Sequence, residues 1–292
     1  MPLVRKPDSG GKTLLLMEYK HGGRFFLGPP DCPDDQLEDV HKVEIRDDDV
    51  ILCSYPKSGC HWLWEMTRML RAGTTNVEVV EKEKYMMEFT PSSELLKHPS
   101  PRTFNTHFLF DQLPQKVQDG KVKLLFVYRN PKDVAVSFYN HHVKFHEYEY
   151  QGKFSDYLSG LFLAGQVDFG QIFTYLKDWE SVLDSRPDLQ VFTVSYEQLH
   201  ADTFNRAKEL ARFLGSSAND DTIRDVVSEC SFGSMQERKG KEWTAQYGEP
   251  VMYRKGKVGD WKTWFTVAES EMMDDICQKE MQGSRFKFQY TL

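Results

Sequence analysis

The sequence VILC (residues 50–53) runs directly into SYPKSGCHW (residues 54–62), and this stretch decides the fold that we predict. The first four residues are apolar and partly β-branched, which favours a short buried strand. Pro56 and Gly59 indicate a tight turn, after which we predict a helix over residues 61–71. A helix begins with free backbone N–H groups and a positive dipole end, so the turn, with Lys57, predicts an anion site. It has the logic of a nucleotide phosphate loop without the pattern GxxxxGK[ST].

The same order of strand, turn and helix recurs twice along the chain. VKLLFVY (residues 122–128) precedes a predicted helix over 131–144, and LQVFTV (residues 189–194) precedes one over 203–214. This alternation predicts an α/β fold, with a central parallel sheet flanked by helices and a P-loop-like phosphate-binding loop. Ligands of such folds bind at the carboxyl ends of the strands, so the loops of interest are 54–60, 129–131 and 195–199.

Bulk properties narrow the class of protein. The 292 residues contain no repeat and no Pro/Gly/Ser linker, so we predict a single domain over 1–292, with residues 1–12 loose. A net charge of −7 argues against binding to nucleic acid or to an anionic membrane. Five scattered cysteines show no metal-ligand spacing and suit a reducing compartment, and the N-terminal apolar run is too short for a signal peptide or a membrane span. We therefore expect a cytoplasmic enzyme without a metal.

Two further segments concentrate groups that can bind phosphate. Arg129 stands at the end of the second strand, where its fork of donors suits a phosphate, and Asn130 and Pro131 can begin the following helix, which carries Ser137. RKGKVGDWK (residues 254–262) has four cations and two glycines in nine residues, which is unusual in an acidic chain. Taken singly, these segments also fit a structural arginine and a solvated run of charges.

Together the three segments resemble the cytosolic sulfotransferases. The motifs are YPKSG (55–59), RNPKDVAVS (129–137) and RKGKVGDWKTWFT (254–266), supported by MEYKHG (17–22), FDQLP (110–114), VSYEQL (194–199) and ARFLG (211–215). The resemblance covers residues 17–292 in the family's order. It implies a donor, 3′-phosphoadenosine 5′-phosphosulfate (PAPS), whose sulfuryl group passes to a small acceptor and leaves the bisphosphate PAP.

The resemblance also implies roles for individual residues. The residues that match the family's phosphosulfate loop are Lys57, Ser58, Gly59, Cys60 and His61. Those that match its adenine site are Trp62, Tyr196, Cys230 and Phe232. Those that match its 3′-phosphate site are Arg129, Ser137, Arg254, Lys255 and Gly256. His107 matches the catalytic histidine, and an imidazole has a suitable pKa to accept the acceptor's proton. Lys57 can neutralise the charge that builds on the leaving phosphate oxygen.

The acceptor and the assembly are implied less directly. By rough position, the residues that line the acceptor pocket are Phe25, Phe26, Phe89, His141, Tyr148, Tyr150 and Met252. Such a pocket favours an apolar or aromatic hydroxyl or amine compound. The spacing KxxxTVxxxE over residues 262–271 resembles the family's dimerisation motif and predicts a homodimer.

The chain departs from the family at the reacting end of the donor. Cys60 and His61 stand where hydroxyl residues are usual, and Asn105 replaces a lysine two residues before His107. Losing one such electrostatic donor typically costs on the order of 10²–10³ in rate. We expect the Asn105 amide to supply a neutral hydrogen bond to the sulfuryl group, and the change Asn105→Lys to raise kcat.

Two functions fit these departures. The first is an active sulfotransferase, and the second is a PAPS-binding protein of the same fold with weak or lost catalysis. A nucleotide kinase is disfavoured, because the sequence lacks GxxxxGK[ST] and an acidic metal ligand after a strand.

Overall fold

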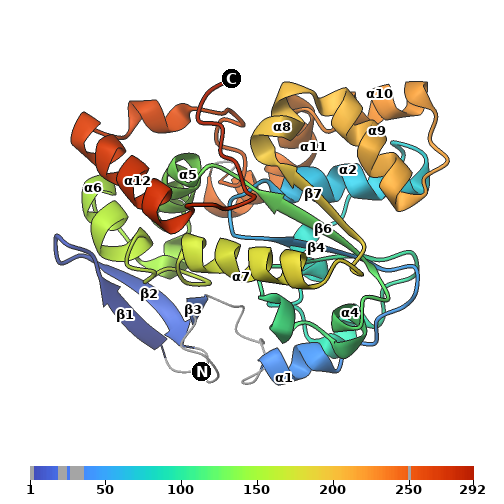
Figure 1. Ribbon diagram of the computed structural model, residues 1–292, viewed down its shortest axis with the longest axis horizontal. Helices are drawn as coiled ribbons and strands as arrows, with labels where there is room; N and C mark the ends of the chain where they lie inside the picture. Colours follow the sequence, from blue (N-terminus) through green and yellow to red (C-terminus); the bar gives the residue numbers. More distant parts are fainter. Residues whose placement is uncertain (1–2, 19–24, 27–35, 249–250) are drawn as a thin grey trace.

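A four-stranded parallel sheet forms the centre of the protein in the computed structural model, which describes residues 3–18, 25–26, 36–248 and 251–292 (Figure 1). The strand order is β5-β4-β6-β7, and every neighbouring pair is parallel. Their bounds are β4 Val50–Ser54, β5 Thr103–Thr106, β6 Lys123–Tyr128 and β7 Val191–Ser195. The predicted α/β fold with a central parallel sheet is therefore confirmed.

Alternate residues of the central strands point to opposite faces of the sheet. Ile51 and Phe126 belong to a core shared with α5 and α7, whereas Leu52 and Val127 belong to a core shared with α2, α9 and α10. Figure 1 shows the sheet between α7 on one side and α2 with α9 on the other. Because both faces are covered, the two central strands, β4 and β6, consist mainly of apolar residues, as is typical of parallel sheets.

The helices follow the strands in sequence. The longer ones are α2 Cys60–Ala72, α5 Pro131–Lys144, α7 Ile172–Ser185, α9 Thr203–Leu214, α10 Asp220–Glu229, α11 Phe232–Tyr247 and α12 Val267–Glu280. The short ones are α1 Gln36–His41, η1 Lys82–Tyr85, α3 Ser92–Leu95, η2 Phe110–Gln112, α4 Gln115–Gln118, η3 His146–Tyr148, α6 Phe154–Tyr157, η4 Leu158–Phe162, α8 Tyr196–Ala201 and η5 Asp260–Thr263. Within the described ranges, no helix combines the length and the apolar character that crossing a membrane requires.

The sequence predicted three of the four strands and the helices that follow them. The fourth, β5, escaped prediction because its four residues TFNT include three polar ones, although all four are buried. Residues 196–201 form helix α8, not the predicted loop, because Ser195 caps the backbone of Gln198 and the Gln198 side chain bonds back to Ser195.

The expectation that residues 1–12 are loose is wrong over residues 3–12. Strand β1 Leu3–Pro7 pairs in antiparallel fashion with β2 Thr13–Glu18, which pairs with β3 Phe25–Phe26. The Asp8 carboxylate holds the turn between β1 and β2, since it accepts hydrogen bonds from the backbone N–H groups of Gly10 at 2.9 Å and Lys12 at 2.8 Å.

A buried ion pair fixes the edge of the sheet that carries β5. Asp49 precedes β4 and Arg102 precedes β5, and neither side chain is exposed. The Arg102 Nε donates to Asp49 Oδ1 at 2.9 Å, and a second guanidinium nitrogen donates to Asp49 Oδ2 at 2.5 Å and to the Glu44 carbonyl at 2.7 Å. The pair therefore ties together the starts of the two strands that lead to residues 54–59 and to His107.

Removing one member of this pair should destabilise the protein strongly. Asp49→Ala leaves the Arg102 charge buried and uncompensated, so the free energy of unfolding should fall by about 3–5 kcal/mol. Asp47→Ala is a matched control, because the Asp47 side chain is 94% exposed in its pair with Lys116, and it should change stability little. Urea unfolding of both variants measures the difference, and equal stabilities would contradict this role.

Candidate functional site

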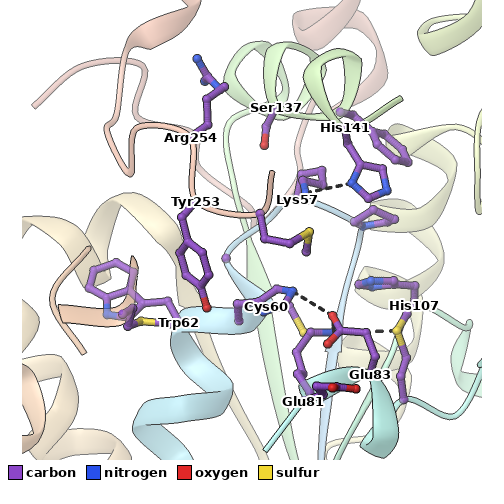
Figure 2. A pocket seen from close by; sticks show the side chains of 18 of the residues that line it. Lys57, Cys60, Trp62, Glu81, Glu83, His107, Ser137, His141, Tyr253 and Arg254 are labelled. Carbon is purple, nitrogen blue, oxygen red and sulfur yellow. Dashed lines mark hydrogen bonds and ion pairs between the residues drawn. The ribbon is translucent and has the colours of Figure 1, made fainter. Parts of the chain in front are cut away.

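A cavity of about 1250 Å³ opens at the carboxyl ends of the parallel strands. Its wall contains the loop after β4, Arg129 after β6, Tyr196 after β7 and His107 after β5. Figure 2 shows Ser137, His141 and Arg254 near Lys57, with Glu83 and His107 in another part of the same cavity. The three segments chosen from the sequence, although far apart in the chain, therefore meet at one site.

The loop after β4 has the backbone that an anion site needs. Lys57 and Gly59 have positive φ angles of 66° and 108°. A Cβ atom on Gly59 would lie 2.7 Å from the ring of Tyr196, so glycine is required there by both conformation and space. Gly59 caps α2 without a side-chain hydrogen bond, which leaves the first N–H groups of the helix for a bound anion.

Lys57 carries its ammonium group into this cavity. Its Nζ lies 3.4 Å from Nδ1 of His141, as the dashed line in Figure 2 marks. Burial lowers the pKa of Lys57 to about 7, and the positive charges of Lys82 and Arg129 add to this effect. The ammonium is therefore only about half charged at neutral pH until an anion binds.

Arg129 and residues 254–257 form a basic part of the wall. Arg129 lies over the ring of Tyr196 at 4.1 Å, donates to the Lys257 carbonyl at 2.9 Å, and keeps a buried Nε without a hydrogen-bond partner. Asp260 forms ion pairs with Arg254 and, at 2.7 Å, with Lys255. These cations are thus held in place and partly neutralised before any ligand arrives.

Asp133 in the first turn of α5 anchors the basic segment to the strand edge. Its carboxylate accepts hydrogen bonds from the backbone N–H groups of Gly259 at 2.8 Å and Trp261 at 3.0 Å. The predicted cap of the same helix is present, since the Asn130 side chain accepts from the Asp133 N–H at 2.8 Å. The sequence did not reveal the anchoring role of Asp133, because its partners lie more than 120 residues away.

Aromatic residues surround another part of the cavity. Trp62 and Tyr196 meet edge to face with 5.5 Å between ring centroids, and Phe232 contacts Tyr253 at 6.4 Å. A Cβ atom on Gly256 would lie 2.2 Å from the Phe232 ring, which explains a glycine within the basic segment. Flat apolar surfaces of this kind suit a purine base.

His107 lies in a part of the cavity away from Arg254, and a hydrogen bond holds it in one tautomer. Its Nδ1 lies 2.6 Å from the carbonyl oxygen of Ser54, and since a carbonyl only accepts, Nδ1 carries the proton and Nε2 is left as an acceptor. Burial, followed by the charge of Lys82, lowers the pKa of His107 to about 3. The ring is therefore neutral at physiological pH.

Buried Glu88 fixes the backbone around His107. One carboxylate oxygen accepts from the backbone N–H groups of His107 and, at 2.9 Å, Phe108, and from the Thr106 hydroxyl at 2.6 Å. Burial raises the pKa of Glu88 to about 7. Sequence reasoning missed this residue, because a lone glutamate in MMEF carries no signal of burial.

Asn105 does not face the ligand as the sequence led us to expect. Asn105 is fully buried, and its side-chain amide forms two hydrogen bonds with Lys82. The Lys82 Nζ donates to Asn105 Oδ1 at 2.8 Å, and Asn105 Nδ2 donates to the Lys82 carbonyl at 3.0 Å. Lys82 lines the cavity in its place. The run KEKY (residues 82–85) is typical of a solvated surface, so sequence reasoning missed it.

His61 does not supply the missing charge. Burial lowers its pKa to about 4, with a further contribution from Lys82, so the imidazole is neutral at pH 7. Its Nε2 lies 3.3 Å from the Glu83 carboxylate, and the charge of Lys82 with the hydrogen bond from His61 overcomes the effect of burial and holds the pKa of Glu83 well below its usual range. Burial raises the pKa of the neighbouring Cys60 thiol.

Most of the other candidate residues lie at the cavity. Those that line it are Lys57, Gly59, Cys60, His61, Trp62, Phe89, His107, Arg129, Ser137, His141, Tyr148, Tyr196, Cys230, Phe232, Met252, Arg254, Lys255 and Gly256. Ser58 and Asn105 are buried behind the lining.

We expected Tyr150 to line the acceptor pocket, but it does not line the cavity. It lies in the core, where its hydroxyl donates to Asp8 at 2.7 Å. Phe25 and Phe26 form β3, and their side chains lie outside the described part of the chain. In the described ranges, no group of three or more His, Cys, Asp or Glu side chains is arranged to hold a metal ion.

Comparisons with known proteins agree with this geometry. Residues 47–285 match the sulfotransferase domain. Mouse sulfotransferase 1A1 is 32% identical over 99% of both chains, and dog sulfotransferase 1B1 is 30% identical over 86% of this chain and 89% of its own. The crystal structure of mouse sulfotransferase SULT7A1 complexed with PAP superposes with a TM-score of 0.77 at 27% identity, covering 92% of this chain and 96% of that one. With most of its length matched to that domain, the chain belongs to the sulfotransferase family.

Proposed function

We propose that the protein transfers a sulfuryl group from PAPS to a hydroxyl or amine of a small apolar or aromatic acceptor. The observation that carries the proposal is a neutral His107, with Nε2 available as a base, in the same cavity as the Lys57 loop. The acceptor oxygen or nitrogen bonds to sulfur and gives its proton to Nε2, while the bond from sulfur to the 5′-phosphate oxygen breaks and its electron pair stays on PAP.

The basic wall supports PAPS as the donor. A nucleotide with both a 5′-phosphosulfate and a 3′-phosphate needs two sets of anion-binding groups, and the cavity offers the loop at Lys57 and the group formed by Arg129, Ser137 and Arg254. Trp62 and Phe232 supply aromatic surface for adenine. The mouse SULT7A1 structure, similar over most of the chain, contains PAP.

Phe89, His141, Tyr148 and Met252 fit the acceptor end, because they line the cavity and are apolar or uncharged. Burial lowers the pKa of His141 well below its usual range, so this ring is neutral too. We further propose a cytoplasmic enzyme, since the cysteines of the described residues, Cys53, Cys60, Cys230 and Cys277, are buried free thiols.

Arg129→Ala should identify the donor. Hydrogen bonds to charged groups contribute roughly 1.5–3 kcal/mol, so binding of PAP should weaken on the order of 10- to 100-fold. Adenosine 5′-phosphosulfate, which lacks the 3′-phosphate, should bind with nearly unchanged affinity. Calorimetric titration of both nucleotides makes the comparison, and equal weakening of the two would remove Arg129 from the 3′-phosphate site.

The pH dependence should follow Lys57 and not His107. An ammonium with its pKa lowered to about 7 is charged below that pH and neutral above it, whereas His107, with a pKa of about 3, stays neutral throughout this range. The value of kcat/KM for PAPS should therefore fall about tenfold from pH 6 to pH 8.

Lys57→Arg is the control for this profile, because a guanidinium keeps its charge. Titration of the donor affects both proteins alike, so the ratio of parent to variant kcat/KM isolates Lys57. A ratio that does not change with pH would contradict the assignment.

We also propose a homodimer formed through residues 262–271. Val267, in the segment that contains Lys262, Thr266 and Glu271, is 75% exposed at the start of α12. An apolar side chain so exposed is available to a second copy of the chain.

Val267→Glu should convert the dimer to a monomer in sedimentation while PAP affinity stays within about twofold, since the segment lies outside the cavity wall. Val79→Glu, another exposed apolar position at 49%, is the matched control and should leave the dimer intact. A dimer that survives Val267→Glu would place the interface elsewhere.

A further inference from the structure

Sulfuryl transfer needs more positive charge at the reacting end than Lys57 supplies. Negative charge lies on the sulfuryl oxygens and grows on the leaving phosphate oxygen as its bond to sulfur breaks, and fixed cations stabilise it. Lys57 has a pKa of about 7, and His61 and His107 are neutral. A second cation would remedy this shortage, and the cavity contains one that the family motifs do not predict.

Lys82, in the short helix η1, brings a second ammonium to this end of the cavity. The residue is only 3% exposed, yet it lines the cavity. One of its three N–H donors is used by Asn105 at 2.8 Å. The thioether sulfur of Met86, at 3.8 Å, is a weak acceptor, and the Glu83 carboxylate forms an ion pair with the ammonium at 3.8 Å, which is too long for a hydrogen bond. The ammonium thus retains donor capacity for a ligand.

The charge of Lys82 acts on the same groups that would surround the sulfuryl group. After burial, it is the largest cause that lowers the pKa values of Lys57, His61 and His107. These three side chains come from the loop after β4, from α2 and from the end of β5, and they line one cavity. The charge of Lys82 therefore acts on both the proposed base and the anion loop.

Two hydrogen bonds with the Asn105 side chain fix the position of Lys82. The Asn105 side chain accepts from the Lys82 ammonium and donates to the Lys82 carbonyl, so both ends of the lysine are tied to one residue of β5. Met86, which directly follows η1, also pairs with Asn105 through an isolated parallel β-bridge of the backbone. At position 105, where the family usually has a lysine, this chain has an asparagine. That asparagine binds Lys82, which reaches the cavity from another segment.

We infer that Lys82 is a catalytic residue that donates to the sulfuryl oxygens during transfer, and that Asn105 is its positioning residue. The inference rests on the proposed reaction. In that reaction the bond from the acceptor to sulfur forms, the bond from sulfur to the 5′-phosphate oxygen breaks, and the acceptor proton moves to His107. Lys82 stabilises the charge on the sulfuryl oxygens, Lys57 stabilises the charge that develops on the leaving phosphate oxygen, and neither gains nor loses a covalent bond.

Lys82→Met tests the catalytic role, because methionine keeps an unbranched side chain without the charge. We expect kcat to fall on the order of 10²–10³, with the dissociation constant of PAP within about threefold of the parent. Ethylammonium added to Lys82→Ala should restore part of the rate by supplying the lost cation. Lys116→Met, at a partly exposed lysine paired with Asp47, is the control and should leave kcat unchanged. A kcat for Lys82→Met within threefold of the parent would overturn the inference.

A binding measurement separates this inference from the proposed function. If the parent transfers sulfuryl to no acceptor, the proposed function fails, and PAPS and PAP binding then test Lys82 alone. Lys82→Met should weaken PAPS about tenfold and PAP hardly at all, because only PAPS carries the sulfuryl group. Equal effects on both nucleotides would overturn the role of Lys82 even where PAPS binds well.

The positioning role of Asn105 has its own test. Asn105→Ala should lower kcat about tenfold with PAP affinity unchanged, and should have no effect when Lys82 is already methionine, because Asn105 acts only through it. Asn105→Lys should also lower kcat, since it removes the acceptor and places a like charge beside Lys82. This reverses the expectation from sequence. Additive losses in the double variant, or a faster Asn105→Lys protein, would contradict the positioning role.

Discussion

The parallel pairing of β4 with β5 and β6 is the constraint on which the site depends. Parallel strands end at one edge of a sheet, so whatever follows each strand is brought together there. The residues delivered in this way are Lys57 after β4, His107 after β5, Arg129 after β6 and Tyr196 after β7. The buried pair of Asp49 and Arg102 fixes the starts of β4 and β5 and hence the spacing between anion loop and base.

The acidic chain contains a cavity rich in cations, and buried carboxylates make this possible. Asp133 holds the backbone of the 254–262 segment, and Asp260 pairs with Arg254 and Lys255. Without these carboxylates, the basic side chains would repel one another in a partly desolvated wall. Glu83, beside His61 and Lys82, plays a similar part at the reacting end. The net charge of −7 therefore says little about the potential inside the cavity.

The chemistry at the reacting end reflects burial as much as residue type. Desolvation lowers the pKa values of His61, His107 and Lys57, which leaves two neutral imidazoles beside a lysine that titrates near neutrality. In such surroundings a histidine is neutral and can accept a proton, although its lowered pKa makes it a weak base, and positive charge is scarce. That scarcity explains why a second lysine, supported by Asn105, matters to the proposed reaction.

The sequence by itself determined the parallel α/β fold, the loop at residues 54–59 and the cavity position of nearly all the residues proposed to bind the cofactor. The fold could be predicted because its signals are local: apolar runs predict strands, and glycines mark the turns. The cofactor-binding residues were assigned through the resemblance of contiguous motifs to the cytosolic sulfotransferases. Only the tertiary structure decided which distant side chains meet. Strand β5 is too short and polar to be recognised alone, Tyr150 turned out to bond Asp8 in the core, and Lys82 looks like a surface lysine until Asn105, 23 residues later, is seen to hold it. Burial and long-range hydrogen bonds are properties of the folded chain, so no window of sequence contains them.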